Sequence, residues 1–264
     1  MGRIITINDD NWQDFVDPNR VGRSMGLIPR DFNKQPVGCM AAAPKFDIPL
    51  IPESEWDDRL REQDKNESSL WHLWMRGGPN GGPIPPLDQN GVGYCWCHSV
   101  VSCILMARAR DNQPYVDLSP FFIGSLIKNY RDEGGWNLEA MEFLAANGVP
   151  EAKYWPQRKR DRSLDTPEMR ANAARHKADE WMDLDDSNWA QVVTCLLLNL
   201  PLAGDYNFWG HSVGVGKLVS LNPRKVKIIN SWGDWGEAGW GDLEGGKACP
   251  NAATALRTTF ASAA

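Results

Sequence analysis

Cysteine and histidine are the residues of this 264-residue chain with the most evident chemistry, and the densest group of them lies in QNGVGYCWCHSV, residues 89–100. Within it, Cys95, Cys97 and His98 fall in four consecutive positions. Zinc knuckles usually separate paired ligands by two or more residues, and no second Cys or His pair follows at ligand spacing. The sequence also has no CxxC pair of the thioredoxin type. The group therefore favours one nucleophilic cysteine over a metal or redox site, which remains a third alternative.

Cys95 lies at the start of a predicted helix. Residues 95–110 are almost uniformly apolar up to Arg108, which predicts a buried helix of about four turns. Unpaired N–H groups and the positive end of the helix dipole stabilise a thiolate at a helix N-terminus. Cys97 lies further along the same helix, so Cys95 is the candidate nucleophile.

A nucleophilic thiol needs an imidazole partner, and the chain has four histidines. His98 would point along the side of the Cys95 helix and not back over its first turn, so it is expected to have a packing role. His72 precedes a Gly- and Pro-rich loop. His176 lies in the charged segment ANAARHKADE, where a solvated surface position is expected. These three are therefore poor candidates for the base.

His211 is the better candidate. It begins one of two predicted antiparallel strands, HSVGVGKLVS and KVKIIN, which are joined by a turn at Asn222 and Pro223. In such a hairpin the first residue of one strand neighbours the last residue of the other. Asn230 is therefore expected beside His211, as an amide that orients the base.

The remaining elements predict an α+β protein with two lobes, helices first and strands second. Residues 1–45 lack periodicity and are predicted to form an extended arm that lies on another surface, and residues 62–86 read as an insert-like loop. Helix signals begin near Glu53 or Ser54 and recur at 119–130, 137–148, 166–181 and 188–200. Residues 230–242 are expected to form a Gly/Trp loop.

Composition excludes several classes of protein. The net charge of −6 and the 42% hydrophobic content argue against disorder and against a nucleic-acid surface. No run of about 18 apolar residues is present, so no membrane partner is expected. The six cysteines are too widely spread for a small disulfide scaffold. Free thiols, and hence a cytoplasmic or otherwise reducing compartment, are expected.

Three segments, QNGVGYCW, HSVGVG and NSWGDWGEAGW, resemble the three motif blocks of papain-like cysteine peptidases of the C1 type. They occur in the family's order, LSP at 118–120 and EGGW at 133–136 resemble further landmarks, and the similarity runs from about Ile48 to Gly241. The resemblance implies a two-lobed papain-like domain over residues 46–264, with a helical left lobe and an antiparallel β-barrel-like right lobe. The active site would lie in the cleft between them.

The resemblance also implies a role for each matching residue, in a chain that needs no cofactor or metal. Cys95 would be the thiolate nucleophile, His211 its imidazolium partner and Asn230 the residue that orients His211. Trp232 would shield the Asn230–His211 bond from water. Gln89 and the Cys95 N–H would form the oxyanion hole. The substrate would be an extended polypeptide.

The walls of the non-primed cleft follow from the same comparison. Gly134 and Gly135 would pair with the substrate backbone as an added strand. Trp136 and Trp209 flank the glycine pair and the histidine block and are expected to narrow the pocket that reads the second residue before the cut. Tyr94 stands where the family has a small residue and is expected to crowd the cleft entrance.

Departures from the family pattern qualify these roles. Val92 and Asp132 occupy the two positions of a family disulfide, so both of its halves are missing together, in agreement with a reducing compartment. The arm at residues 1–45 is too short and lacks the helical pattern of the family's inhibitory propeptide, so it is not expected to be one. The alternative function is a papain-fold structural or decoration protein of a larger assembly such as a virus particle. Its triad would be masked or unused, and its arm would contact other subunits.

Overall fold

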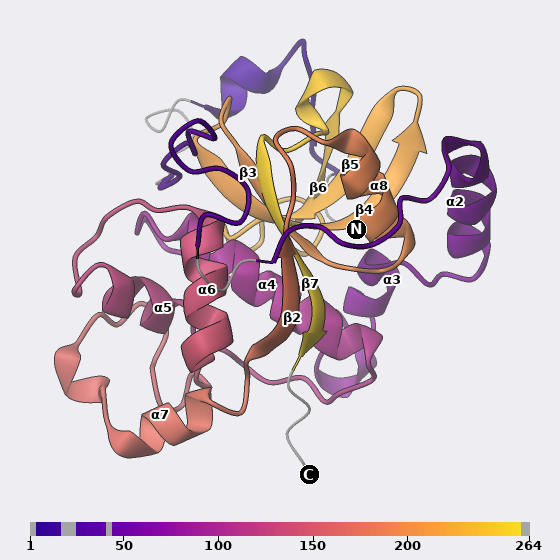
Figure 1. The fold of residues 1–264 in the computed structure, drawn as a ribbon. Coiled ribbons are helices and arrows are strands. Elements are labelled where there is room, and N and C mark those ends of the chain that lie inside the picture. Colours follow the sequence, from indigo (N-terminus) through magenta and orange to yellow (C-terminus); the bar gives the residue numbers. More distant parts are fainter. Residues whose placement is uncertain (1–3, 17–24, 41–43, 260–264) are drawn as a thin grey trace.

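The computed structural model describes residues 4–16, 25–40 and 44–259 of the chain. Figure 1 shows a helical part, in magenta and pink, beside a strand-rich part, in orange and yellow. The described helices are α2 (Trp56–Lys65), α3 (Leu70–Trp74), α4 (Cys95–Arg110), α5 (Pro120–Ile127), α6 (Asn137–Asn147), α7 (Pro167–Ala173) and α8 (Trp189–Leu197). The described strands are β1 (Thr6–Ile7), β2 (Ala178–Asp183), β3 (Leu202–Tyr206), β4 (His211–Leu221), β5 (Arg224–Ile229), β6 (Trp240–Glu244) and β7 (Ala252–Thr259). Short 3-10 turns cover Trp12–Phe15, Glu53–Glu55, Pro79–Gly81, Arg162–Leu164 and Gly245–Lys247.

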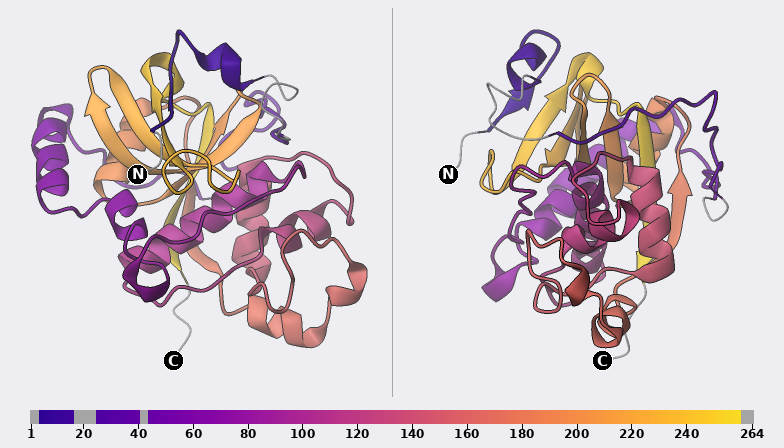
Figure 2. Two further views of the ribbon diagram at one scale, coloured as in Figure 1. Left: turned by 180° about the vertical axis from the view of Figure 1, so that it is seen from behind. Right: turned by 90° about the vertical axis from the view of Figure 1, so that its left-hand side faces the viewer.

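Helix α4 is the central element of the fold. Its residues are buried from Cys95 to Arg108, as the nearly continuous apolar sequence predicts for a helix covered on all sides. It packs against α3, α5 and α6 of the helical part and against β3, β4 and β7 of the sheet. The views in Figure 2 agree with its position where the two parts meet. The first residue of α4, Cys95, is thereby fixed at the boundary between the lobes.

The described strands form one seven-stranded sheet in the order β1-β6-β5-β4-β3-β7-β2. All neighbours are antiparallel except β1 and β6, which pair in parallel. Strand β3 alternates between two cores: Leu202 and Tyr206 belong to a cluster inside the sheet, whereas Ala203 belongs to the cluster around α4. The α+β, two-lobed fold expected from the sequence is confirmed.

Several predicted elements match the structure closely. The helices at 95–110 and 137–147 are present, Gly148 ends α6 with a positive φ of 78°, and Pro120 opens α5 at its first turn. The β4–β5 hairpin turns at Asn222 and Pro223, as predicted. Residues 230–239 form the expected irregular loop, but β6 begins already at Trp240. These segments are the ones whose local signals agree with their packing.

Two predicted segments were wrong. The helix expected over residues 166–181 ends at Ala173, because residues 178–183 pair with β7 as strand β2. His176 follows that helix end and is buried, not solvated, and burial lowers its pKa to about 4. The insert-like loop at 62–86 contains the end of α2 and all of α3, whose Leu70 and Trp74 pack into the core around α4.

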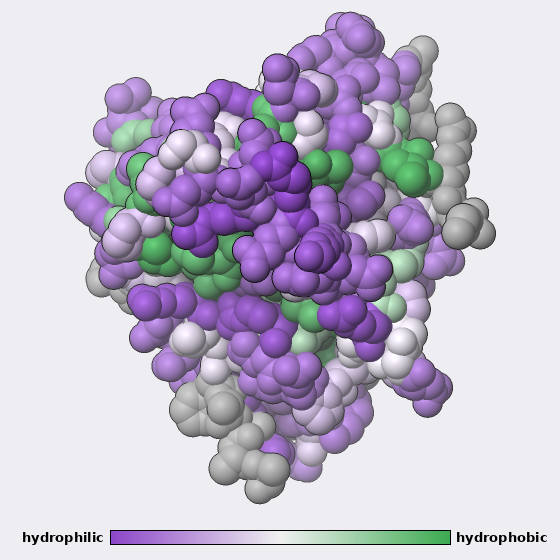
Figure 3. Space-filling model, turned by 90° about the vertical axis from the view of Figure 1, so that its right-hand side faces the viewer, coloured by the Kyte–Doolittle hydropathy of each residue, from purple (hydrophilic) through white to green (hydrophobic). Residues whose placement is uncertain are grey.

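Exposed large apolar side chains are few among the described residues. No helix in the described ranges is long and apolar enough to cross a bilayer. The face drawn in Figure 3 is mainly hydrophilic, with small and separate hydrophobic areas. The side chain of Leu198 and that of Ile28 are among the few large apolar groups that are exposed.

Candidate active site

Cys95 lies at the first position of α4, as the sequence predicts, and it has no exposed surface (0%). Burial raises the pKa of its thiol to about 12, and the negative charge of Asp205 raises it further. Backbone groups of Ser212, Gly26 and Trp96 near the sulfur act in the opposite direction. The thiol is therefore protonated at neutral pH in this arrangement, despite its place at a helix N-terminus.

His211 and Asn230 are in contact. The Asn230 Oδ1 lies 2.8 Å from Nε2 of His211 and also accepts the Ser231 N–H at 2.8 Å. Nδ1 of His211 has no hydrogen-bond partner within the described part of the chain. Burial lowers the pKa of His211 to about 4, although the bond to Asn230 opposes this shift. The ring is thus neutral, held from one side, and unpaired on the other.

Two tryptophans enclose the His211 ring. The Trp209 and Trp232 rings each lie 4.8 Å from it, centroid to centroid, and pack edge to face against one another at 5.6 Å. The Trp209 indole N–H donates to the Phe15 carbonyl of the arm at 2.9 Å. Trp232 thus lies where it can keep water from the His211–Asn230 bond, whereas Trp209 connects the histidine to the arm.

Gln89 lies beside this group on the loop before α4. Its backbone N–H donates to the Ser231 carbonyl at 2.9 Å, and its Oε1 accepts the Ser231 hydroxyl at 2.6 Å. Its Nε2 donates to the Val92 carbonyl at 2.8 Å. Gln89 and Asn230 are therefore connected through Ser231, although 141 positions separate them in the sequence (230 − 89 = 141).

The glycine pair forms one wall next to the thiol helix. A Cβ on Gly135 would lie 2.6 Å from the Trp96 ring, and a Cβ on Gly134 would lie 2.6 Å from the Gly26 carbonyl oxygen. Gly135 is therefore required by the indole beneath it. Gly134 is required by a backbone segment that lies over it, and that segment belongs to the arm.

Residues 25–28 of the arm run through the place where a substrate would pair. Leu27 forms a parallel bridge with Gly135: the Ile28 N–H donates to the Gly135 carbonyl at 2.9 Å, and the Gly135 N–H donates to the Gly26 carbonyl at 2.9 Å. On the other side, the Leu27 N–H donates to the carbonyl of Gly210 at 3.1 Å. In Figure 1 this indigo segment lies near α6, where the two parts of the molecule meet. The arm thus spans both walls beside Cys95.

Arg30 anchors the arm beyond this crossing. Its guanidinium makes a bidentate ion pair with Asp183 of β2 at 2.7 and 2.9 Å, and both side chains are almost wholly buried. Arg30 also donates to the carbonyls of Gln35 and Pro36, and the Gly38 N–H donates to Asp183. The pair is therefore fully hydrogen-bonded, which is the condition under which a buried ion pair is tolerated.

One expectation about the cleft is wrong. Residues 26–28 of the arm lie across the cleft beside Cys95, and the described parts of the arm contain no long helix. Tyr94 does not crowd the cleft entrance: it is fully buried in the helical part, and its hydroxyl donates to the Arg131 carbonyl at 2.6 Å. A Cβ on Gly124 would lie 2.5 Å from the Tyr94 ring, so a glycine there makes room for it.

Asp132 joins the loop before α4 to the segment before Gly134 by a hydrogen bond. Its Oδ1 accepts the Gly93 N–H at 2.8 Å, across 39 positions of sequence. This bond joins the two segments in which Val92 and Asp132 stand at the positions of a family disulfide. All six cysteines of the chain are free.

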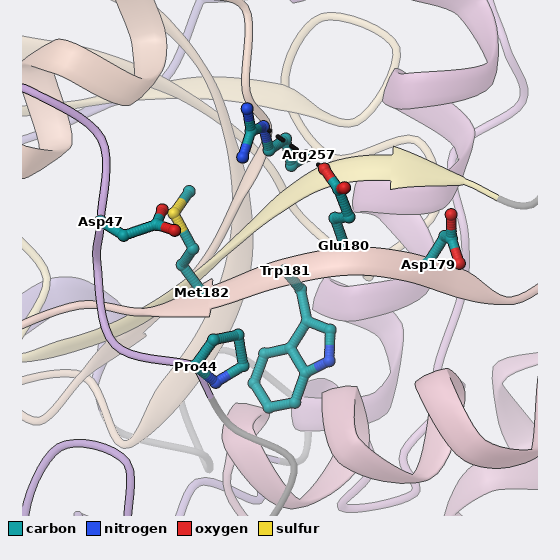
Figure 4. Close-up of a pocket in the computed structure, with 7 residues that line it drawn as sticks. All are labelled: Pro44, Asp47, Asp179, Glu180, Trp181, Met182 and Arg257. Carbon is teal, nitrogen blue, oxygen red and sulfur yellow. Dashed lines mark ion pairs between the residues drawn. The ribbon is translucent and has the colours of Figure 1, made fainter.

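The remaining members of the 95–98 group pack in the helical core. His98 is buried, with Nδ1 2.7 Å from the Tyr94 carbonyl and its ring edge-on to Phe121. In the described ranges no cluster of three or more His, Cys, Asp and Glu side chains could hold a metal ion. A pocket of about 270 Å³ lies elsewhere, on the outer edge of β2, and Figure 4 shows Trp181 and Met182 among its lining residues. None of the candidate site residues lines it.

Comparison with known proteins finds relatives of similar sequence. Cathepsin L 2 of Paramecium tetraurelia is 28% identical over 178 residues, which cover 61% of this chain and 56% of that protein. Zingipain-2 of Zingiber officinale is 24% identical over 185 residues, covering 61% of this chain and 82% of that protein. The chain is thus similar in sequence to papain-like cysteine peptidases, at low identity. It spans only about half the length, 56%, of the cathepsin L relatives that it matches.

Solved structures with the same fold include papain-like proteins from distant organisms. Xylellain, a cysteine protease from Xylella fastidiosa, superposes with a TM-score of 0.63 at 18% identity, over 89% of this chain and 96% of that one. A digestive procathepsin L2 proteinase from the larval midgut of Tenebrio molitor gives 0.62 at 15% identity, over 98% of this chain and 85% of that one. No family model matches the chain. The papain-like fold is thus shown, at low sequence identity.

Proposed function

We propose that the chain is a papain-like cysteine peptidase held in a covered, inactive arrangement by its own arm. The observation that carries the proposal is the His211 ring: Asn230 holds it through Nε2, Nδ1 has no hydrogen-bond partner in the described part of the chain, and its strand β4 packs against α4. Asn230 fixes the orientation of the ring, and the strand that carries His211 packs against the helix that begins at Cys95. A thiol that must give up a proton requires such a base.

The proposed reaction uses Cys95 as nucleophile. With the arm displaced, the proton moves from Sγ to Nδ1 of His211, and the thiolate attacks the carbonyl carbon of the substrate. The Cys95 N–H and the Gln89 side chain stabilise the oxyanion that forms. His211 then protonates the leaving amine as the C–N bond breaks, and water hydrolyses the thioester with the same histidine as base. Asn230 keeps the ring in its productive orientation throughout.

The covered arrangement is unsuited to this reaction. The high pKa of Cys95 and the low pKa of His211 both arise chiefly from burial, and both favour the neutral pair over thiolate and imidazolium. Gly134 and Gly135 would pair with an extended substrate, but their backbone is occupied by residues 26–28. Peptide hydrolysis therefore requires that the arm leave the cleft first.

Selective labelling tests the proposal. The intact chain is treated with an epoxide inhibitor or iodoacetamide at near-neutral pH, with and without mild destabilisation of the arm, and the modified cysteine is located by mass spectrometry. We expect Cys95 to react slowly when covered, and far faster than the other buried cysteines, Cys97, Cys103 and Cys195, once the arm is loosened. His211→Ala should abolish this selectivity. Equal labelling of all accessible thiols under both conditions contradicts the proposal.

Burial of Cys95 also fits the second candidate, a structural protein whose triad is masked. In that case Cys95→Ala leaves assembly intact, and an arm variant that no longer seats abolishes it. Peptidase activity released by loosening the arm would favour the first candidate. The free state of all six cysteines supports, for either function, the proposal of a reducing compartment.

A further inference from the structure

A polar row crosses the face of the sheet that lies against the cleft. Asp205 of β3 pairs with Ser212 of β4, and Ala203 of β3 pairs with Thr254 of β7. Cross-strand partners project from the same face, and residues two apart on one strand do so too. Asp205, Ser212 and Thr254 therefore share the face of Ala203, which packs in the cluster around α4.

Asp205 is a buried acid without full pairing. It is 1% exposed, and its Oδ2 accepts the Asn137 N–H at 3.2 Å. Its Oδ1 has no hydrogen-bond partner in the described part of the chain, and neither has the nearby Thr254 hydroxyl. The Ser212 hydroxyl, which lies beside the carboxyl, donates to Ser99 of α4 at 2.8 Å. Buried polar groups in proteins are nearly always satisfied, so these two oxygens indicate a missing donor.

The Asp205 carboxyl, of which Oδ1 is unpaired, lies near Cys95. Its charge raises the pKa of Cys95, and the backbone of its partner Ser212 contacts the thiol. Asn137, which donates to it, directly follows the wall of Gly135 and Trp136. Asp205 thus lies between the wall of Gly135 and the strand that begins at His211.

Leu27 of the arm lies between the same two walls. It bridges Gly135, its N–H donates to the Gly210 carbonyl, and it is largely buried in the cluster that contains Ala203. A leucine side chain can exclude water from a carboxylate but cannot donate a hydrogen bond to it. Burial accordingly raises the pKa of Asp205 to about 7, which Ser212, Asn137 and the charge of Arg30 oppose.

The arm itself shows which group this face of the sheet binds well. Asp183 of β2 is the cross-strand partner of Thr254, so it lies in the same row as Asp205. Asp183 holds the Arg30 guanidinium in a buried, bidentate pair. Asp183 thus binds a cation of the arm, whereas Asp205, on the same face, has one oxygen without a hydrogen-bond partner in the described part of the chain.

We propose that Asp205 binds the basic side chain, lysine or arginine, of the substrate residue that replaces Leu27 against Gly135. The cation would satisfy the unpaired Oδ1, with Thr254 as a further hydrogen-bonding group. This inference rests on the proposed peptidase function and names its substrate class: polypeptides with a basic residue at that position of the non-primed side. It also gives the arm a reason to be displaceable, because Leu27 offers no hydrogen-bond donor to the Oδ1 of Asp205.

Peptide hydrolysis provides the first test. The intact chain is assayed with fluorogenic dipeptide amides that differ only in the varied position, which carries arginine, lysine or norleucine. Norleucine matches the reach of lysine without its charge. We expect kcat/KM to be about tenfold or more higher for the basic residues, the size of one charge-assisted hydrogen bond, mostly through KM. In Asp205→Asn this ratio should fall to about one. An unchanged ratio in the variant, or no preference in the unaltered chain, overturns the proposal.

The second test needs no catalysis. Leu27→Lys places an ammonium group over Asp205 within the arm itself, and Leu27→Met is its uncharged control. We expect Leu27→Lys to slow labelling of Cys95 about tenfold relative to Leu27→Met, because the new bond holds the arm. In the Asp205→Asn background the two should label alike. If Leu27→Lys loosens the arm equally in both backgrounds, Asp205 does not bind the cation.

The two tests separate the failure of this inference from that of the proposed function. If all peptides are cleaved without a preference for a basic residue, the chain is a peptidase and Asp205 has only a structural role. If no peptide is cleaved and Cys95 is labelled no faster than the other cysteines, the proposed peptidase function is wrong. The Leu27→Lys comparison, read by the melting temperature in place of labelling, then still decides whether Asp205 binds a cation.

Discussion

Residues 25–40 of the arm bind the domain at two places in two different ways. In the cleft, residues 26–28 are held by backbone hydrogen bonds to Gly135 and Gly210, which any extended peptide could make. At the anchor, Arg30 is held by its side chain, through a buried pair with Asp183 and two carbonyl acceptors. The first contact is replaceable by substrate, whereas the second is specific to this arm. A segment of this kind can vacate the cleft without losing its attachment.

Removing the anchor is expected to have the largest effect. Arg30→Ala leaves Asp183 buried without its partner, and breaking a buried pair in this way costs about 3–5 kcal/mol. If the arm carries most of that cost, Cys95 labelling should accelerate by two orders of magnitude or more. Lys34→Ala is the matched control, because Lys34 forms an exposed pair with Asp31 and should change little. Equal labelling rates in both variants would mean that the anchor does not hold the arm.

A substitution in the cleft tests the other contact. A Cβ on Gly26 would lie 2.0 Å from the Gly93 carbonyl oxygen, and that oxygen belongs to backbone that cannot easily move. Gly26→Ala should therefore unseat residues 26–28 at a cost of about 2–3 kcal/mol, as overpacking does. Labelling of Cys95 should rise, while a hydrogen-exchange measurement still shows protection at the Gly38 N–H bound to Asp183. Ile28→Ala, at an exposed side chain, is the control and should label like the unaltered chain. Loss of protection at Gly38 would show that the two contacts open together.

Lowering the pH should affect the contact between residues 26–28 and the cleft through His211 and Asp205, whose effects on the stability of the covered state oppose one another. The covered His211 has its pKa lowered to about 4, so the stability that it gives the covered state is lost as the pH falls through 6.5 toward 4. The covered Asp205 has its pKa raised to about 7, so its contribution is full below about 4 and is lost as the pH rises through 7. If the open state restores ordinary pKa values, a fall from pH 7.5 to 5 lowers the free energy of arm opening by about 2 kcal/mol through His211 and raises it by about 2–3 kcal/mol through Asp205.

The two terms therefore nearly cancel in the unaltered chain, and single variants should separate them. As the pH falls from 7.5 to 5, the arm should open more easily in Asp205→Asn, where only His211 titrates. It should open less easily in His211→Gln, where only Asp205 titrates. Hydrogen exchange at the Leu27 and Ile28 amides, corrected for the intrinsic pH dependence of exchange, measures the opening. Identical pH profiles in both variants would show that neither group titrates with the position of the arm.

The sequence predicts the parts of this site whose signals are local. An apolar run beginning at Cys95 predicts α4, and the alternation around His211 and the turn at residues 222–223 predict the hairpin that brings Asn230 to the histidine. The roles of these residues in catalysis remain a prediction. The path of the arm could not be read in this way, because Arg30 and Asp183 are 153 positions apart and neither carries a local signal.

Tyr94 and β2 are two further places where local sequence signals fail to predict the structure. Tyr94 replaces a small residue before the nucleophile, and only the packing against Gly124 reveals that its ring turns into the helical core. Residues 178–183 continue a helical pattern in sequence, yet β7 offers them a strand edge. Tertiary contacts outweigh weak local preference in both cases. Asp205 was missed because a lone acid in a short strand has no distinguishing spacing.

The smallest predicted effect concerns the loop that supports the cleft contact. Asp132 holds Gly93 by one hydrogen bond, and Gly93 is the residue against which Gly26 packs. Asp132→Ala should cost about 1 kcal/mol, the usual net value of a single hydrogen bond, and lower the melting temperature by a few degrees. Glu133→Ala, which removes only the exposed pair with Arg131, is the control and should change the melting temperature less. Because the loop carries the cleft contact and not the anchor, Asp132→Ala should also raise Cys95 labelling slightly while Arg30 stays bound. A drop in stability with no change in labelling would show that Gly93 does not position the arm.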